Sequence, residues 1–101
     1  MVMRYIAVTA TGDASGMQLG QMAIPEPGPD ALLVRVLAAG VNRPDILQRQ
    51  GLYPAPEDAS PVLGLEVAGE VVACGKQVSR WKVGDKVCAL VNGGGYADYA
   101  L

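Results

Sequence analysis

The sequence predicts a mainly β fold, a small and partly open β-barrel with one short helix. Short apolar runs alternate with turns, and the 101 residues include 13 glycines and 7 prolines. Only one segment, beginning near residue 43, combines a helix start signal with helical spacing of its apolar residues. No internal repeat divides the chain, and its length is typical of one domain.

The expected strands lie at residues 4–9, 17–24, 32–41, 66–75, 84–91 and 96–101. The run over 32–41 is nearly continuous in apolar residues, with Arg35 its only charge, so we expect it to be covered on both faces. In the strand at 66–75, Gly69 permits tight coiling. Side chains alternate along a strand, so Glu66 and Glu70 share one face.

A short helix is expected from Arg43 to Gln50. Asn42 is a cap residue, Asp45 stands three residues later as in a capping box, and Gly51 supplies a left-handed stop. The proline-rich segment that follows, residues 53–61, suits a loop that covers a site. Asn42 and Asp45 either hold the helix start, worth about 1 kcal/mol each, or belong to a functional site.

Charge and cysteine usage limit the function classes. The net charge of -2 offers no basic footprint for nucleic acid. Basic residues do gather around Trp81, but an acidic residue interrupts them, which favours a solvated hairpin loop. Cys74 and Cys88 stand far apart and are expected to be small buried hydrophobes in a reducing compartment. The first residues form neither a signal peptide nor a membrane span, so a cytoplasmic location is expected.

Two apparent motifs carry no chemistry. The run at residues 93–95 lacks both phosphate-binding glycine patterns and precedes no helix, so it is expected to be a loop. Glu66 and Glu70 would lie roughly 13 Å apart along a strand, too far for a cooperating acid and base. A salt-bridge or surface role is expected for Glu70, and the role of Glu66 stays open.

Four ordered motifs resemble one family; they lie at residues 41–45, 48–54, 63–71 and 81–87. The chain is similar to the N-terminal, GroES-like domain of the medium-chain dehydrogenase/reductase superfamily, and within it to the zinc-independent quinone oxidoreductases of the p53-inducible type. The resemblance covers nearly the whole chain, from Met3 to Leu101. It implies a GroES-like barrel that is incomplete here and truncated before the Rossmann domain.

The resemblance also implies hydride transfer from NADPH to a quinone or related conjugated carbonyl. Asn42 would hydrogen-bond near the nicotinamide and Arg43 would approach the cofactor, while Tyr53 would donate to a quinone oxygen and Leu65 would line the acceptor site. Asp45 would orient this catalytic cluster. The plainer interpretation is a helix cap, a solvated arginine and a packed tyrosine.

The same resemblance argues against zinc. Zinc-dependent members of the superfamily carry Cys where this chain has Asn42 and His where it has Leu65. Catalytic zinc needs three protein ligands, and the chain contains no histidine. We therefore expect no zinc.

The sequence ends at Leu101 without the glycine fingerprint that holds dinucleotide phosphates. We expect an N-terminal fragment that is inactive alone and belongs to a homodimer when full length. Two other classes stay open. One is a free-standing GroES-like binding or scaffold module, and the other is an enoyl-thioester reductase or an idle relative of the same superfamily.

Overall fold

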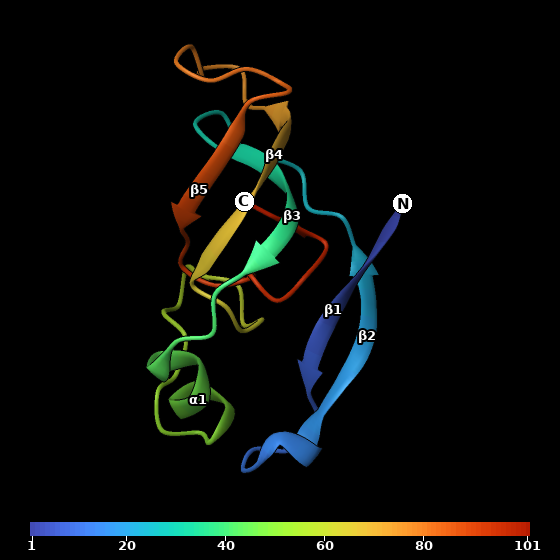
Figure 1. Ribbon diagram of the computed structural model, residues 1–101, viewed down its shortest axis with the longest axis vertical. Coiled ribbons are helices and arrows are strands. Elements are labelled where there is room, and N and C mark those ends of the chain that lie inside the picture. The colour runs from blue at the N-terminus through green and yellow to red at the C-terminus, as the bar shows by residue number, and fades with distance from the viewer.

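The computed structural model describes all of residues 1–101 and contains two antiparallel sheets (Figure 1). The smaller sheet pairs β1 (Val2–Val8) with β2 (Met17–Ala23), joined through the short 3-10 helix η1 (Ala14–Gly16). The larger has the strand order β5 (Lys86–Leu90), β4 (Glu66–Cys74), β3 (Leu32–Ala39) and β6 (Tyr99–Ala100). The one α-helix, α1 (Arg43–Arg49), connects β3 to β4. The predicted mainly β fold with one short helix is confirmed.

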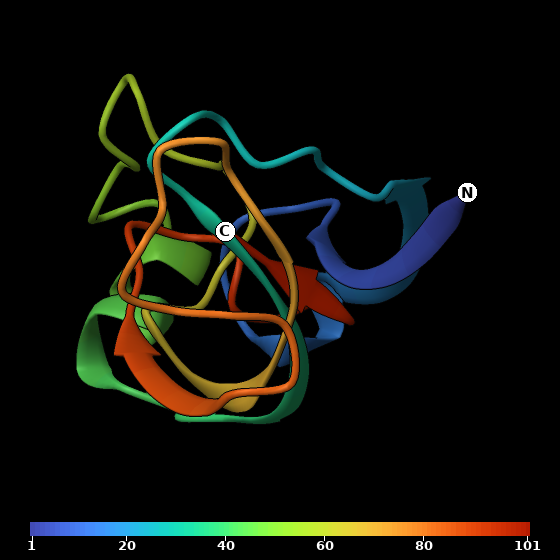
Figure 2. The ribbon, with the colours of Figure 1, turned by 90° about the horizontal axis from the view of Figure 1, so that it is seen from above.

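The larger sheet curves strongly and does not close into a barrel. Seen from above, it bends round the segment that carries the C-terminus (Figure 2). Gly69 on β4 is buried, and a Cβ there would collide with the carbonyl oxygen of Arg35 on β3. The pairing of β3 with β4 shifts register between Val36 and Ala38, close to this contact. The missing side chain therefore allows the two strands to approach closely.

The core lies on one face of β4 and against the segment that precedes it. Val67 and Val71 are fully buried, whereas Glu66, just before Val67, and Ala68, just after it, are exposed. The predicted alternation of side chains along this strand is confirmed. Leu63 completes the most deeply buried group. Beside β5 a groove of about 290 Å³ remains open and is lined only by apolar residues.

An ion pair fastens β1 to the segment before β6. Arg4 donates from Nε and Nη2 to the two carboxylate oxygens of Asp98, at 3.1 and 3.0 Å, and its backbone N–H donates to the same carboxylate at 2.9 Å. These hydrogen bonds lower the pKa of Asp98 and raise that of Arg4. The two sheets are thereby held together across 94 residues of sequence.

Two predictions about the strands are wrong. The strand expected over 32–41 ends at Ala39, and its outer face is open, with Leu37 58% exposed. Burial of neighbouring positions is confined to the first half of the strand, where Leu33 and Val34 are both buried. The final strand is also shorter than the predicted 96–101: only Tyr99 and Ala100 pair with β3.

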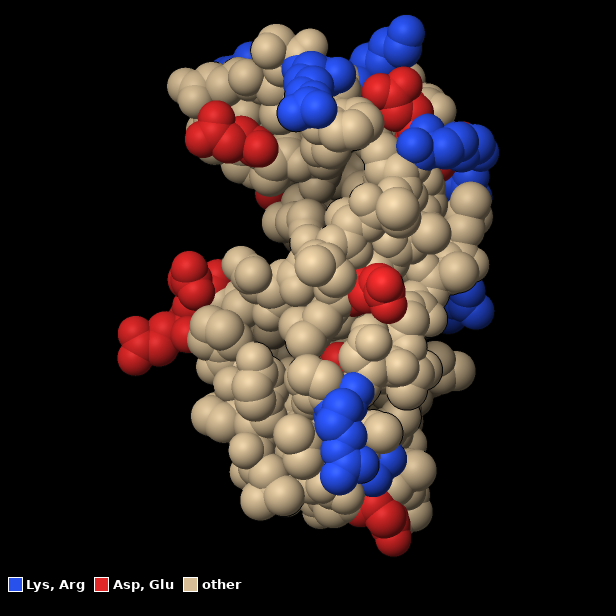
Figure 3. Space-filling view, turned by 60° about the vertical axis from the view of Figure 1, so that its left-hand side comes forward, with Lys and Arg blue, Asp and Glu red and all other residues tan.

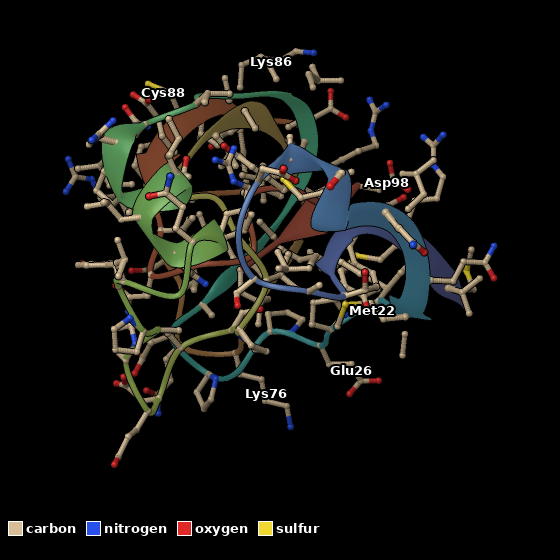
Figure 4. All side chains as sticks on the ribbon, turned by 90° about the horizontal axis from the view of Figure 1, so that it is seen from below. Met22, Glu26, Lys76, Lys86, Cys88 and Asp98 are labelled. Atoms are coloured by element: carbon tan, nitrogen blue, oxygen red, sulfur yellow. The ribbon has the colours of Figure 1, made fainter.

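The cysteines are not buried as expected. Cys88 is exposed and projects from the outer side of β5 together with Lys86 (Figure 4), and Cys74 is half-buried. The alternation along β5 accounts for this, because Lys86, Cys88 and Leu90 face outward. Both thiols are free.

The charged residues near Trp81 behave as predicted. Residues 75–85 form the loop between β4 and β5, where the Arg80 guanidinium lies 5.6 Å from the centre of the Trp81 ring. Glu70 forms ion pairs with Lys86 at 3.1 Å and Arg35 at 3.7 Å, so its predicted salt-bridge role is confirmed. The pKa of Glu70 is lowered, and the main cause is the hydrogen bond from Lys86.

No helix of the chain is both long and apolar enough to cross a membrane, since α1 has only 7 residues.

Candidate functional site

The helix α1 begins where β3 turns away from β4. Gly40 still donates its backbone N–H to the carbonyl of Glu66, at 2.9 Å, and the chain then leaves the sheet. Asn42 caps the helix with extended backbone angles, and its N–H donates to Oδ2 of Asp45 at 3.0 Å. The helix spans Arg43–Arg49, one residue shorter than expected, and Gly51 adopts the predicted left-handed conformation at φ 81°. Of the predicted capping box, the hydrogen bond from the Asn42 N–H to the Asp45 side chain is present, while the N–H of Asp45 donates to the backbone carbonyl of Asn42 at 3.0 Å.

The far end of α1 is tied to the turn between β1 and β2. Arg49 accepts the N–H of Gly12 on its carbonyl and donates Nε to the carbonyl of Gly12, both at 3.0 Å. From the last turn of the helix, Gln48 donates Nε2 to the carbonyl of Pro61 at 3.2 Å and so holds the proline-rich loop. A helix this short is not stable by itself, so its contacts with these other segments both hold it in place and stabilise it.

Asp45 is the most buried polar residue of the chain, with 2% of its surface exposed. Its Oδ2 accepts the N–H of Asn42 and also the phenolic O–H of Tyr96, at 2.9 Å. Its other oxygen, Oδ1, is buried without a hydrogen-bond partner in the protein. One carboxylate oxygen of Asp45 therefore joins the helix start to the loop after β5, and the orienting role of Asp45 stays a prediction.

Tyr96 is the residue that sequence reasoning missed. Partial burial, the hydrogen bond to Asp45 and the negative charge of that carboxylate raise the pKa of Tyr96 to about 12. Its backbone N–H donates to the carbonyl of Leu63 at 2.8 Å, and Gly64 has no Cβ that would strike the tyrosine. A buried carboxylate needs a donor, but nothing in the sequence says which of the four tyrosines supplies it.

Asn42 also makes a contact with β4. Its Nδ2 donates to Oε1 of Glu66 at 3.1 Å, so the side-chain amide spans from the helix start to the first residue of the strand. Glu66, whose role stayed open in the sequence, is thus the partner of a predicted site residue. Arg43 is exposed and makes neither an ion pair nor a side-chain hydrogen bond.

Tyr53 and Leu65 line one groove of about 280 Å³, called here the Tyr53 groove, whose other lining residues are Gln48, Pro56, Leu90, Val91 and Asn92. None of these residues is charged. The face that carries α1 and β5 is correspondingly hollowed at mid-height and mostly uncharged there (Figure 3). Tyr53 is 41% exposed, and its O–H makes no hydrogen bond within the protein.

The predicted site residues therefore fall into two groups. Asn42, Arg43 and Asp45 lie at the start of α1, whereas Tyr53 and Leu65 line the groove. The two groups adjoin through the chain, because Leu65 directly precedes the Glu66 that holds Asn42. No three side chains of His, Cys, Asp or Glu in residues 1–101 are grouped to hold a metal ion.

Residues 28–101 match the model of the alcohol dehydrogenase GroES-like domain. Over 95 residues the chain is 41% identical to a probable quinone oxidoreductase of Schizosaccharomyces pombe, covering 93% of this chain and 28% of that protein. The crystal structure of human synaptic vesicle membrane protein VAT-1 homolog-like protein superposes with a TM-score of 0.90 at 35% identity, over 99% of this chain and 32% of that one. The chain thus spans about a third or less of these longer proteins.

Two further matches carry other names. An acryloyl-coenzyme A reductase of Sulfurisphaera tokodaii is 35% identical over 84% of this chain and 25% of its own length. A cobalt- and zinc-bound thermostable alcohol dehydrogenase from Pyrobaculum aerophilum superposes with a TM-score of 0.85 at 28% identity, over 99% of this chain and 38% of that one. The fold is therefore common to proteins of different chemistry, and the residues of the site must distinguish them.

Proposed function

Because the chain belongs to the alcohol dehydrogenase GroES-like domain family, within the medium-chain dehydrogenase/reductase superfamily, we propose that it is the acceptor-binding part of a longer NADPH-dependent quinone oxidoreductase. The Tyr53 groove is the observation that carries the proposal. It is uncharged and mainly apolar, with the amides of Gln48 and Asn92 as its other polar groups, and the O–H of Tyr53 makes no hydrogen bond within the protein. A flat conjugated carbonyl compound matches that combination of apolar surface and free hydrogen-bond donors.

In this proposal Tyr53 donates a hydrogen bond to the acceptor oxygen as negative charge develops on it. Leu65 packs against the acceptor. Bound NADPH supplies the hydride, and the protein supplies positioning and electrostatics.

The residues at the start of α1 fit the nicotinamide end of such a cofactor. The backbone N–H of Asn42 donates to Asp45 and one of its two side-chain N–H groups donates to Glu66, so the second side-chain N–H is free. The Arg43 guanidinium is unpaired in solvent. The chain has no glycine fingerprint, so the phosphates and adenosine would be bound by residues outside it. We therefore propose that residues 1–101 act only within the longer protein and have no reductase activity alone.

The donor set does not fit zinc. Leu65 has no ligand atom, the neutral amide of Asn42 is not among the thiolate, imidazole and carboxylate ligands of zinc, and the chain has no histidine. We propose a zinc-independent reaction, although one superposed alcohol dehydrogenase binds cobalt and zinc. A cytoplasmic homodimer that engages neither nucleic acid nor membrane completes the proposal. The net charge of -2 supports the part that concerns nucleic acid, because it offers no basic footprint.

The second candidate is an enoyl-thioester reductase, favoured by the match to an acryloyl-coenzyme A reductase. A panel of quinones and enoyl thioesters, each given to the full-length protein with NADPH, separates the two. We expect NADPH oxidation with the quinones. Oxidation with the thioesters alone would favour the second candidate, and oxidation with neither would favour a binding module. Residues 1–101 alone should give no turnover above background.

A further inference from the structure

Glu66 and Glu70 lie on the same face of β4 but have different partners. Glu70 is neutralised by two cations, Lys86 and Arg35. Glu66 has no cationic partner, and its one side-chain hydrogen bond comes from Nδ2 of Asn42, at 3.1 Å. The carboxylate of Glu66 is therefore directed at the cap of α1 rather than at a balancing charge.

Gly40 makes room for this contact. A Cβ at Gly40 would collide with Oε1 of Glu66 and would lie 3.3 Å from Nδ2 of Asn42. The backbone of Gly40 does not have a positive φ, so its conformation does not itself demand glycine. What the missing side chain provides here is the space in which the carboxylate meets the amide.

The chemistry of the two groups fixes the direction of the amide. An ionised carboxylate only accepts hydrogen bonds, so the nitrogen of the Asn42 amide, and not its oxygen, must face Glu66. The oxygen of the amide then faces away from Glu66. One of the two amide hydrogens is used by Glu66, and the second is free to donate.

We infer that Glu66 is a positioning residue, which fixes the Asn42 amide so that one N–H is presented to a carbonyl oxygen of the cofactor. This inference rests on the proposed function. Without Glu66 the amide can rotate by half a turn and present its oxygen, which would repel a carbonyl. Glu66 itself touches neither cofactor nor acceptor in this account.

The test begins with a readout that is independent of activity. Residues 1–101 contain two asparagines, Asn42 and Asn92, and the side chain of Asn92 makes no hydrogen bond. In the full-length protein labelled with ¹⁵N in asparagine, the side-chain signals of Asn42 are assigned by their loss in Asn42→Asp. Glu66→Ala and Gly40→Ala should both remove the downfield shift of the hydrogen-bonded Nδ2 proton, and the Asn92 signals should stay in place.

Glu70→Ala is the matched control, because it removes the same charge from the same face of β4 without touching Asn42. It should leave the Asn42 signals unchanged. That result would show that the shift of the Asn42 signals in Glu66→Ala does not come from altered folding of β4. Gly40→Ala displaces the carboxylate while leaving both polar groups in the chain. Agreement between the Gly40 and Glu66 variants therefore isolates the contact itself.

Binding of NADPH to the full-length protein gives the second readout. Loss of one positioned hydrogen bond should raise the Kd for NADPH about two- to tenfold in Glu66→Ala and in Gly40→Ala. The double variant should show no further rise, since both changes remove one contact. The KM for the quinone should remain near that of the wild type.

Unchanged Asn42 signals in Glu66→Ala would overturn the inference, as would additive increases of Kd in the double variant. If the wild-type protein fails to bind NADPH at all, the proposed function falls. In that case the amide signals alone decide whether Glu66 positions Asn42.

Discussion

The phenolic oxygen of Tyr96 donates to Oδ2 of Asp45 at 2.9 Å, across 51 residues of sequence. The same carboxylate oxygen accepts the N–H of Asn42. A single buried acceptor thus connects the loop after β5 with the start of α1, where the proposed cofactor contacts lie.

Replacing Tyr96 by Phe should destabilise the protein. The change removes one of the two donors to a buried carboxylate but keeps the aromatic ring. We therefore expect a loss of about 1 to 3 kcal/mol in the free energy of unfolding. Denaturant titration measures it. Tyr99→Phe is the control, because the Tyr99 hydroxyl makes no hydrogen bond. Equal stability of the two variants would contradict the assigned contact.

The same pair predicts a loss of stability at alkaline pH. The pKa of Tyr96 is raised from 10.0 to about 12 in the folded state, so the folded protein holds this proton more tightly than the unfolded chain. The stabilisation is complete below pH 10 and is lost as the pH rises toward about 12. Unfolding measured across that range should show a steeper decline for wild type than for Tyr96→Phe. Parallel curves would mean that Tyr96 does not titrate as described.

Gly69→Ala should be strongly destabilising. The added methyl group meets the backbone carbonyl of Arg35, which cannot move aside without distorting the pairing of β3 and β4. Overpacking of this kind costs about 1 to 3 kcal/mol. Ala68→Ser, at the neighbouring exposed position, should change the midpoint of thermal unfolding far less. A Gly69→Ala protein as stable as Ala68→Ser would show that the strands do not approach as closely as observed.

Local features of the chain were predictable from its sequence. The capping box of Asn42 and Asp45, the stop at Gly51 and the alternation along β4 depend on a few neighbouring residues and on the periods of helix and strand. Such signals do not require knowledge of what lies across the fold.

Long-range contacts were not predictable. The apolar run over residues 32–41 predicted cover on both faces, but the second half of β3 is mostly exposed. Cys88 is apolar enough for a core, yet its place in the alternation of β5 turns it outward. Tyr96 meets Asp45, and Glu66 meets Asn42, only because the sheet brings together segments distant in sequence.

The most direct test of the central claim is quinone-dependent oxidation of NADPH by the full-length protein with Tyr53→Phe. We expect kcat/KM for the quinone to fall about tenfold to a hundredfold, because the donor to the developing negative charge is lost. The Kd for NADPH should not change. Tyr5→Phe, which removes a hydroxyl that makes no hydrogen bond, should behave as wild type. Undiminished quinone turnover in Tyr53→Phe would contradict the assignment of the Tyr53 groove as the acceptor site.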